Sequence, residues 1–233
     1  MANEIQKPKF LITLTAPSCA GKSYLLDYIR NVAKLPCLIS TTTRAKRAGE
    51  VEGVDYYFIT EERSKEIEAQ NGFAELAHYR GVRYGVTNEE YFAKLDQGVA
   101  FLIVEPGGID HYTQPAKDAG AIHLKYFIHT DMDIRLERLK KRMRADIQQA
   151  IIDDSMQQTM ATMIGRTAAL PLLSDTIVSA MNPHFDRMAA MLTSEQKWFQ
   201  MADWTRVLFG KDNPENNLQI ILNDVKTETL IKR

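Results

Sequence analysis

The fold is decided by the stretch Phe10-Leu-Ile-Thr-Leu-Thr-Ala-Pro-Ser-Cys-Ala-Gly-Lys-Ser23. Its residues from Phe10 to Thr15 are apolar or β-branched, which predicts a buried strand. The residues from Ala16 to Ser23 fit the phosphate-binding pattern G-x-x-x-x-G-K-[ST], except that alanine occupies the first position. Apolar residues then recur at helical spacing from Tyr24 to Val32. A strand, a tight turn and a helix in this order open an α/β unit.

The turn between this strand and helix predicts an ATP site. Backbone N–H groups of such a loop and of the helix N-terminus form a nest for phosphates. We expect Lys22 to reach the β- and γ-phosphates and the Ser23 hydroxyl to ligate the Mg²⁺ that accompanies ATP. A chance Gly-Lys-Ser at a strand–helix junction is the alternative interpretation. The residues predicted to bind ATP are Ala16, Pro17, Ser18, Cys19, Ala20, Gly21, Lys22 and Ser23.

The composition excludes several other classes of protein. The chain has 233 residues, of which 45% are hydrophobic and 25% charged, as in soluble globular proteins of one or two domains. A net charge of −1 gives no overall field that would attract nucleic acid or an anionic membrane. The apolar run from Phe10 to Ala16 is too short for a signal sequence or a membrane span. The two cysteines fit a reducing compartment, so we expect a cytoplasmic protein.

The rest of the chain predicts an α/β core with one inserted lobe. Residues 40–98 are polar and punctuated by glycine, which indicates hairpins and a helix near 61–70. Further core elements are expected as strands at 36–39, 99–104, 123–129 and 218–222 and helices at 109–118 and 132–144. The predicted parts are a core of 1–39, 99–136 and 217–233, the lobe at 40–98, and a helical lid and insert at 137–216.

The insert has a composition of its own. Residues 145–216 contain a single glycine and a stripe of methionines at helical spacing, which favours packing against another helix or a second copy of the chain. The stripe consists of Met156, Met160 and Met163. We expect Pro171 and Pro183 to break the helix, which resumes over 194–209. Trp198 and Trp204 are expected to anchor the packing.

A second cluster of polar residues follows the first helix. It reads Ser40-Thr-Thr-Thr-Arg44-Ala-Lys-Arg47-Ala-Gly49-Glu50 and continues with Gly53-Val-Asp-Tyr56. Two arginines three residues apart, beside hydroxyl groups, can hold a phosphate through bidentate hydrogen bonds. Taken alone, a basic stretch of this kind is more often a solvated face.

The run from Thr42 to Tyr56 closely resembles the acceptor-binding segment of guanylate kinases. The resemblance continues through Gly72-Phe-Ala-Glu75, Tyr84-Gly85 and Glu105-Pro-Gly-Gly108, and covers about residues 9–144. It implies an α/β P-loop kinase core with a parallel sheet, an acceptor-binding lobe and a helical lid. The implied activity is transfer of the γ-phosphoryl group of ATP to a nucleoside monophosphate, with guanylate or its deoxy form as first choice.

The resemblance also implies roles by position. Ser40 and Glu75 would face the base, because a carboxylate can accept from guanine N1–H and N2–H₂ together. The tyrosines and arginines of the lobe would hold the acceptor phosphate. The implied acceptor-binding residues are Ser40, Arg44, Arg47, Tyr56, Glu75, Tyr84, Val86 and Glu105. The implied catalytic residues are Lys22, Arg44 and the lid arginines Arg138 and Arg142.

Three positions depart from the pattern of the family. Val86 stands where guanylate kinases usually have a hydroxyl group that donates to the base carbonyl, and Thr87 could replace it only if the loop slipped by one residue. Glu105 is one methylene longer than the usual aspartate, and Met143 replaces a lid glycine. Arg144 and Arg166 are the candidates for the missing later lid arginine.

Two alternatives remain open on the sequence alone. A related P-loop kinase could use another nucleotide or a sugar phosphate as acceptor, although Glu75 argues against an acceptor without a base. Guanylate-kinase-like domains that only bind phosphopeptides have degraded P-loops, and the intact Gly21-Lys22-Ser23 argues against that class.

Overall fold

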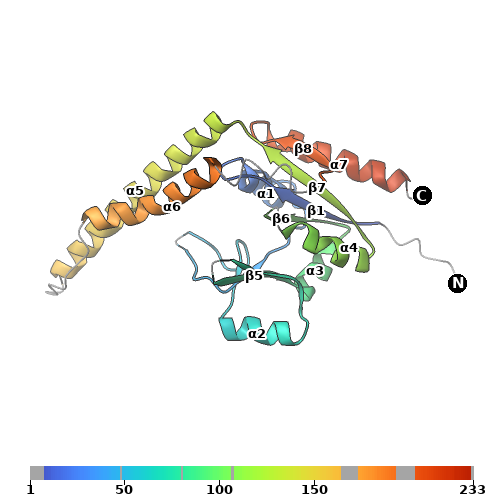
Figure 1. Cartoon of the computed structure of the whole chain (residues 1–233), viewed down its shortest axis with the longest axis horizontal. Coiled ribbons are helices and arrows are strands. Elements are labelled where there is room, and N and C mark those ends of the chain that lie inside the picture. Colours follow the sequence, from blue (N-terminus) through green and yellow to red (C-terminus); the bar gives the residue numbers. More distant parts are fainter. Residues whose placement is uncertain are drawn as a thin grey trace. The chain divides into compact units, whose positions relative to one another are not determined.

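Two compact units make up the chain. The computed structural model describes residues 8–47, 49–79, 81–105, 108–163, 173–192 and 203–231. The first unit combines Met1–Ala16, Gly21–His129 and Gln200–Arg233, and the second combines Pro17–Ala20 with Thr130–Phe199. Figure 1 labels the helices and strands of both units.

A parallel sheet forms the core of the first unit. Its strands are β1 (Lys9–Thr15), β6 (Val99–Ile103), β7 (Ala121–His129) and β8 (Arg206–Phe209), in the order β6-β1-β7-β8, and every neighbouring pair is parallel. The side chains of β1 are buried almost throughout, as expected for a central strand covered on both faces. Around this sheet lie α1 (Lys22–Asn31), α4 (Thr113–Asp118) and α7 (Pro214–Ile231).

A second, mixed sheet forms the lobe of the same unit. It contains β2 (Thr41–Thr42), β3 (Tyr57–Phe58), β4 (Phe73–Tyr79) and β5 (Val82–Thr87), in the order β3-β2-β5-β4. Only the β2–β3 pair is parallel. The helices α2 (Glu61–Ala69) and α3 (Asn88–Leu95) begin at Thr60 and Thr87, whose hydroxyl groups each accept a backbone N–H bond. A parallel sheet with a mixed-sheet subdomain confirms the predicted fold class.

The second unit is built on two helices that pack against each other. They are α5 (Met132–Met163) and α6 (Leu173–Leu192), shown in yellow and orange in Figure 1. A polar contact joins them, since His184 of α6 lies 2.9 Å from the carboxylate of Asp146 on α5. Across the parts of the chain that the structure describes, no helix has the length and apolar character needed to cross a membrane.

The prediction of a strand at 218–222 is wrong, because this segment lies inside α7. Asn213 accepts the backbone N–H of Glu215 at 2.9 Å, which caps the start of the helix. Pro214, Asn217, Leu218 and Ile221 are buried at the spacing of one helix face. The strand that completes the core sheet is β8, part of the segment that had been predicted to resume a helix. The short strand expected at 36–39 is reduced to one bridge between Cys37 and Phe101.

The insert also differs from its prediction. Pro183 lies inside α6 and does not end it. Met156 is 60% exposed, so among the described residues this part of the methionine stripe is largely uncovered. The Trp204 ring contacts Phe127 of β7 within the first unit, with ring centroids 5.1 Å apart. Its role as an anchor of the helical pair stays a prediction. Pro171 and Trp198 lie outside the described residues.

The helical register of α7 can be tested by substitution. Ile221 is fully buried, whereas Ile220 is half-buried on another side of the helix. We expect Ile221→Ala to lower the free energy of unfolding by about 2–5 kcal/mol, because it leaves a cavity in the core. Ile220→Ala should cost clearly less. Urea unfolding of both variants measures the difference, and equal losses would contradict the register described here.

Candidate functional site

The loop between β1 and α1 has the backbone expected of a phosphate nest. Gly21 caps α1 with a φ of 103°, and Cys19 also has a positive φ of 61°. The N–H of Ala20 donates to the Pro17 carbonyl at 3.2 Å, which closes a turn within the loop. Left-handed residues set between such turns aim successive N–H groups into one concave space. At Gly21 a side chain would be strained, which explains why glycine is needed there.

Donors from the start of α5 hold the carbonyl groups of this loop. Within the second unit, Arg135 Nε donates to the Ser18 carbonyl at 2.9 Å and Arg138 Nη1 to the Cys19 carbonyl at 3.1 Å. A third bond joins the Thr130 hydroxyl to the Ala20 carbonyl at 2.8 Å. Because C=O and N–H point in opposite directions across a trans peptide, these bonds fix where the loop N–H groups point.

The lid residues therefore have different surroundings. Arg138, which the sequence singled out, contacts the loop backbone, whereas Arg142 lies exposed on α5. Sequence reasoning missed Arg135 and Thr130. The signal for Arg135 was its position three residues before Arg138, on the same helix face. Arg144 is exposed and Arg166 lies outside the described residues.

Lys22 forms an ion pair at the carboxyl end of the core sheet. Its Nζ lies 3.2 Å from Oε1 of Glu105, two residues after the end of β6 at Ile103. The Lys22 side chain is 19% exposed and that of Glu105 is 66% exposed, so the pair is open to solvent on one side. Ser23 is exposed in the first turn of α1. Ligands of α/β sheets bind at this edge, beyond the carboxyl ends of the strands.

Arg44 is held in place by a carboxylate and an aromatic ring of the lobe. Its two terminal nitrogens donate to the two oxygens of Glu50 at 3.0 and 2.8 Å, and its guanidinium lies 5.5 Å from the centre of the Tyr56 ring. Burial raises the pKa of Glu50, but the hydrogen bonds from Arg44 and from the Arg47 backbone outweigh it and lower the pKa overall. The Arg47 side chain itself is exposed.

Two tyrosines complete this cluster. The Tyr56 and Tyr84 rings meet edge to face, with centroids 6.1 Å apart. Burial, and next the nearby Tyr84, raise the pKa of Tyr56, so its hydroxyl stays protonated at neutral pH. Ser40 is half-buried before β2, where its carbonyl accepts the Tyr57 N–H at 2.9 Å. The structure thus brings Arg44, Tyr56 and Tyr84 together.

Glu75 is a nearly buried carboxylate on β4. Its side chain is 8% exposed, and its Oε2 accepts a hydrogen bond from the Tyr112 hydroxyl at 2.9 Å. His111 Nδ1 lies 3.6 Å from Oε1. Burial raises the pKa of Glu75, while the contacts with Tyr112 and His111 oppose that rise. Both contacting residues belong to the short 3₁₀ helix η2 (Asp110–Tyr112), and no sequence motif pointed to them.

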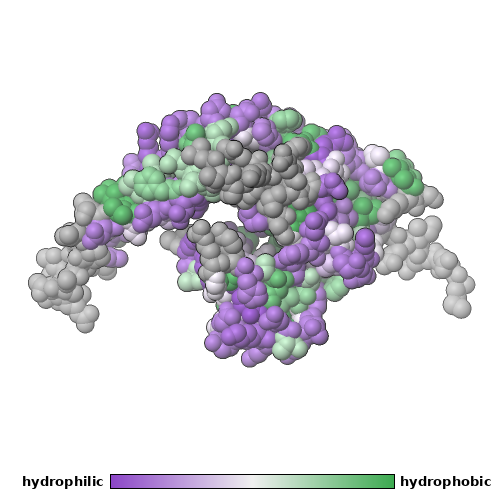
Figure 2. Space-filling view, viewed as in Figure 1, coloured by the Kyte–Doolittle hydropathy of each residue, from purple (hydrophilic) through white to green (hydrophobic). Residues whose placement is uncertain are grey.

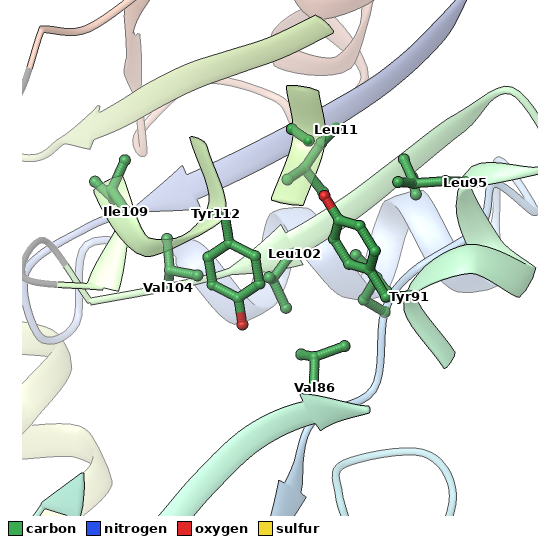
Figure 3. Packing of buried hydrophobic residues seen from close by; sticks show 11 residues of the cluster. Leu11, Val86, Tyr91, Leu95, Leu102, Val104, Ile109 and Tyr112 are labelled. Atoms are coloured by element: carbon green, nitrogen blue, oxygen red, sulfur yellow. The ribbon is translucent and has the colours of Figure 1, made fainter. Parts of the chain in front are cut away.

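Val86 lies in the hydrophobic core. It is fully buried and is the cross-strand partner of Glu75 on β5. Figure 3 shows its side chain directed from β5 toward the rings of Tyr91 and Tyr112. The Thr87 hydroxyl oxygen accepts the backbone N–H of Glu90 and so caps the start of α3. Thr87 is therefore already used as a helix cap. A role for Val86 in acceptor binding stays a prediction, and its burial favours an indirect one.

The comparisons with known proteins point to one family. A family model described as guanylate kinase matches residues 8–167. A guanylate kinase of Synechococcus sp. (strain JA-3-3Ab) is 37% identical over 136 residues, covering 58% of this chain and 59% of that protein. For a guanylate kinase of Shewanella frigidimarina the identity is 34% over 156 residues, covering 66% of this chain and 73% of that protein.

A solved structure agrees on the fold. The crystal structure of guanylate kinase from Anaplasma phagocytophilum superposes with a TM-score of 0.53 at 17% identity, covering 96% of this chain and 87% of that chain. The sequence alignments are shorter. They span 40% to 65% of the length of four of the guanylate kinases that the chain resembles.

The Arg44–Glu50 pair predicts a pH-dependent stability. The pKa of Glu50 is lower in the folded chain than in the unfolded chain, where it is about 4.3. The ionised Glu50 therefore stabilises the fold fully above the unfolded pKa, and this contribution is lost as the pH falls through the folded pKa. Glu50→Gln should therefore cost about 1 kcal/mol near neutral pH and almost nothing in acid. Urea unfolding across this range checks it. Glu89→Gln, an exposed site on α3, is the control, and a pH-independent loss in Glu50→Gln would contradict the ion-pair origin.

Proposed function

The chain belongs to the guanylate kinase family, and on that premise we propose that it transfers the γ-phosphoryl group of ATP to guanylate. One observation carries the choice of acceptor. In the antiparallel β4–β5 pair, Glu75 is opposite Val86 and Ala77 is opposite Tyr84, so Glu75 and Tyr84 share a face of the lobe sheet. A base contact at Glu75 and a phosphate contact at Tyr84 would suit the two ends of one nucleotide.

The opposite face of the lobe sheet supports this assignment. Arg83 alternates with Tyr84 and is 7% exposed, with its Nε donating to the buried Ser64 hydroxyl on α2 at 2.8 Å. Its Nη2 also donates to Glu68 of the same helix. Because α2 contacts β5 through Arg83, the proposed ligand surface is on the opposite face, with Glu75 and Tyr84. The Val86 end of that face is covered by the hydrophobic core. Because side chains alternate between the two faces of β5, Arg83 anchors the strand to α2 on one face and Tyr84 lies on the proposed binding face.

ATP would bind at the loop between β1 and α1, with Lys22 at its phosphates. Mg²⁺ fits the Ser23 hydroxyl as an oxygen ligand in the first turn of α1. In the described part of the chain, no group of three or more His, Cys, Asp or Glu residues could hold a metal ion. When bound, Mg²⁺ would neutralise phosphate charge during the transfer.

The residues themselves would act by positioning and by electrostatics. Lys22 would have to exchange its contact with Glu105 for the phosphates of ATP, and Arg44 would hold the acceptor phosphate in line. Arg138 and Arg142 would supply positive charge to the transferring group, and closure of the lid would exclude water. A cytoplasmic location stays a prediction, as does the lack of a nucleic-acid partner.

Self-association through the insert also stays a prediction. Apolar side chains of α6 remain exposed, and Figure 2 shows apolar residues along this helix. The exposed fractions are 53% for Val178, 47% for Phe185 and 38% for Met188.

The proposed reaction is tested by turnover. We expect the purified chain, with Mg²⁺ and ATP, to form ADP and GDP from guanylate faster than from any other common nucleoside monophosphate. Lys22→Ala should lower kcat by several orders of magnitude with the fold retained, because the lysine stabilises charge on the phosphates. Turnover of the variant within about tenfold of wild type would contradict a P-loop mechanism. Preference for another base or for a sugar phosphate would overturn guanylate as the acceptor.

The two lobe arginines should separate in a second assay. Arg47 is exposed, so Arg47→Ala should raise the KM for guanylate about tenfold or more without loss of stability or of ATP affinity. Arg44→Ala should raise the same KM and also destabilise the lobe, because Glu50 loses its partner. Steady-state kinetics and thermal unfolding measure both effects. Equal losses for ATP and guanylate would contradict an acceptor role.

A further inference from the structure

A buried tyrosine holds the carboxylate that is proposed to recognise the base. Tyr112 is 2% exposed, and its hydroxyl donates to Glu75 Oε2 at 2.9 Å. We propose that Tyr112 is a positioning residue for base recognition, which fixes the Glu75 side chain for a purine that presents two adjacent N–H donors. This inference rests on the proposed function.

The position of Tyr112 is itself fixed by packing. It ends η2, and its ring stacks on Tyr91 with centroids 6.4 Å apart. Val86, Ile109 and Tyr91 belong to the same buried cluster, as Figure 3 shows. A ring enclosed in this way directs its hydroxyl along one line. The Tyr112 hydroxyl that donates to Glu75 is therefore already ordered before a ligand binds.

The hydrogen bond leaves Glu75 able to accept from a ligand. An ionised carboxylate has about four lone-pair sites, and Tyr112 occupies one of them on Oε2. Guanine offers N1–H and N2–H₂ side by side, which requires both carboxylate oxygens to be presented together. Adenine has no N1–H, so an oriented Glu75 would be left with an unpaired oxygen. The tyrosine hydroxyl thus orients the acceptor pair without blocking it.

Among the described residues, His111 and Val86 also face Glu75. His111 Nδ1 lies 3.6 Å from Oε1, but the His111 side chain is 57% exposed, so a ligand or water can replace this contact. From β5 the facing residue is the apolar Val86. Burial raises the pKa of Tyr112 well above 10, so the hydroxyl keeps its proton and stays a donor at every pH of interest. Tyr112 is therefore the constant donor to Glu75.

The pKa of Glu75 distinguishes a hydrogen-bonding role of Tyr112 from a role in packing alone. Burial raises its pKa, and the bond from Tyr112 is the largest influence that lowers it. Removing the hydroxyl should let the pKa rise further. Because the ionised form accepts from the base, the acid limb of the kcat/KM profile for guanylate should move to higher pH.

The chain offers a matched pair of substitutions for the test. Tyr112→Phe removes the hydroxyl and keeps the ring. Tyr91→Phe is the control, since Tyr91 is stacked on Tyr112 and buried, and its hydroxyl has no hydrogen-bond partner among the described residues. We expect Tyr112→Phe to raise the KM for guanylate about ten- to a hundredfold with the ATP KM and kcat little changed. Tyr91→Phe should leave all three near wild type.

A titration of the ligand-free protein completes the experiment. The Glu75 carboxyl, followed by ¹³C NMR, should titrate at higher pH in Tyr112→Phe than in wild type and in Tyr91→Phe. An unchanged guanylate KM together with an unchanged Glu75 titration overturns the inference, while the proposed function stands on wild-type turnover. A wild-type chain that does not phosphorylate guanylate overturns the proposed function, whatever the titration shows.

Discussion

The loop between β1 and α1 can present its N–H groups to phosphates only if its carbonyl oxygens are satisfied elsewhere. A buried carbonyl without a donor costs about 1–3 kcal/mol. Three consecutive residues of this loop, the half-buried Ser18 and Cys19 and the buried Ala20, turn their carbonyl groups toward side-chain donors. Side chains at the start of the second unit, from Thr130, Arg135 and Arg138, supply a donor to each. These bonds make the geometry of the loop a property of the folded chain before any ligand binds.

In the lobe, the two faces of β5 carry side chains with different roles. Along β5, the buried Arg83 bonds to α2 on one face, and its neighbour Tyr84 lies on the other face next to Arg44 and Tyr56. The backbone contributes as well, because the Thr43 and Arg83 backbones are joined at 3.1 Å directly beside Arg44. Strand β5, anchored through Arg83, thus positions the cluster of Arg44, Tyr56 and Tyr84 as well as the residue opposite Glu75. Gly85 allows this pairing, since a Cβ there would meet the Glu75 carbonyl at 2.6 Å.

The sequence predicted the parts of this structure that rest on short, local patterns. The strand, loop and helix from Lys9 to Asn31 follow from residue types and spacing alone. The segment at 218–222 did not, because five mostly apolar residues fit a strand and a helix equally well, and the cap at Asn213 decides between them. The contact of Tyr112 with Glu75 joins residues 37 apart in sequence, so only tertiary packing reveals it. Val86 was expected to face a ligand by position, but its neighbours in the core decide its burial.

The two arginines of the lobe divide a phosphate site into a fixed half and an exposed half. Arg44 uses its terminal nitrogens on Glu50 and on the Ala45 carbonyl, yet a guanidinium carries five N–H donors, so it can bind an anion without leaving Glu50. Ordering a free arginine side chain costs up to about 2 kcal/mol, and Arg44 has already met this cost in the folded chain. Arg47 still has to meet it, although its backbone N–H is held 2.8 Å from Glu50. The affinity for a phosphate should therefore depend mainly on Arg44, while Arg47 adds charge that salt can screen.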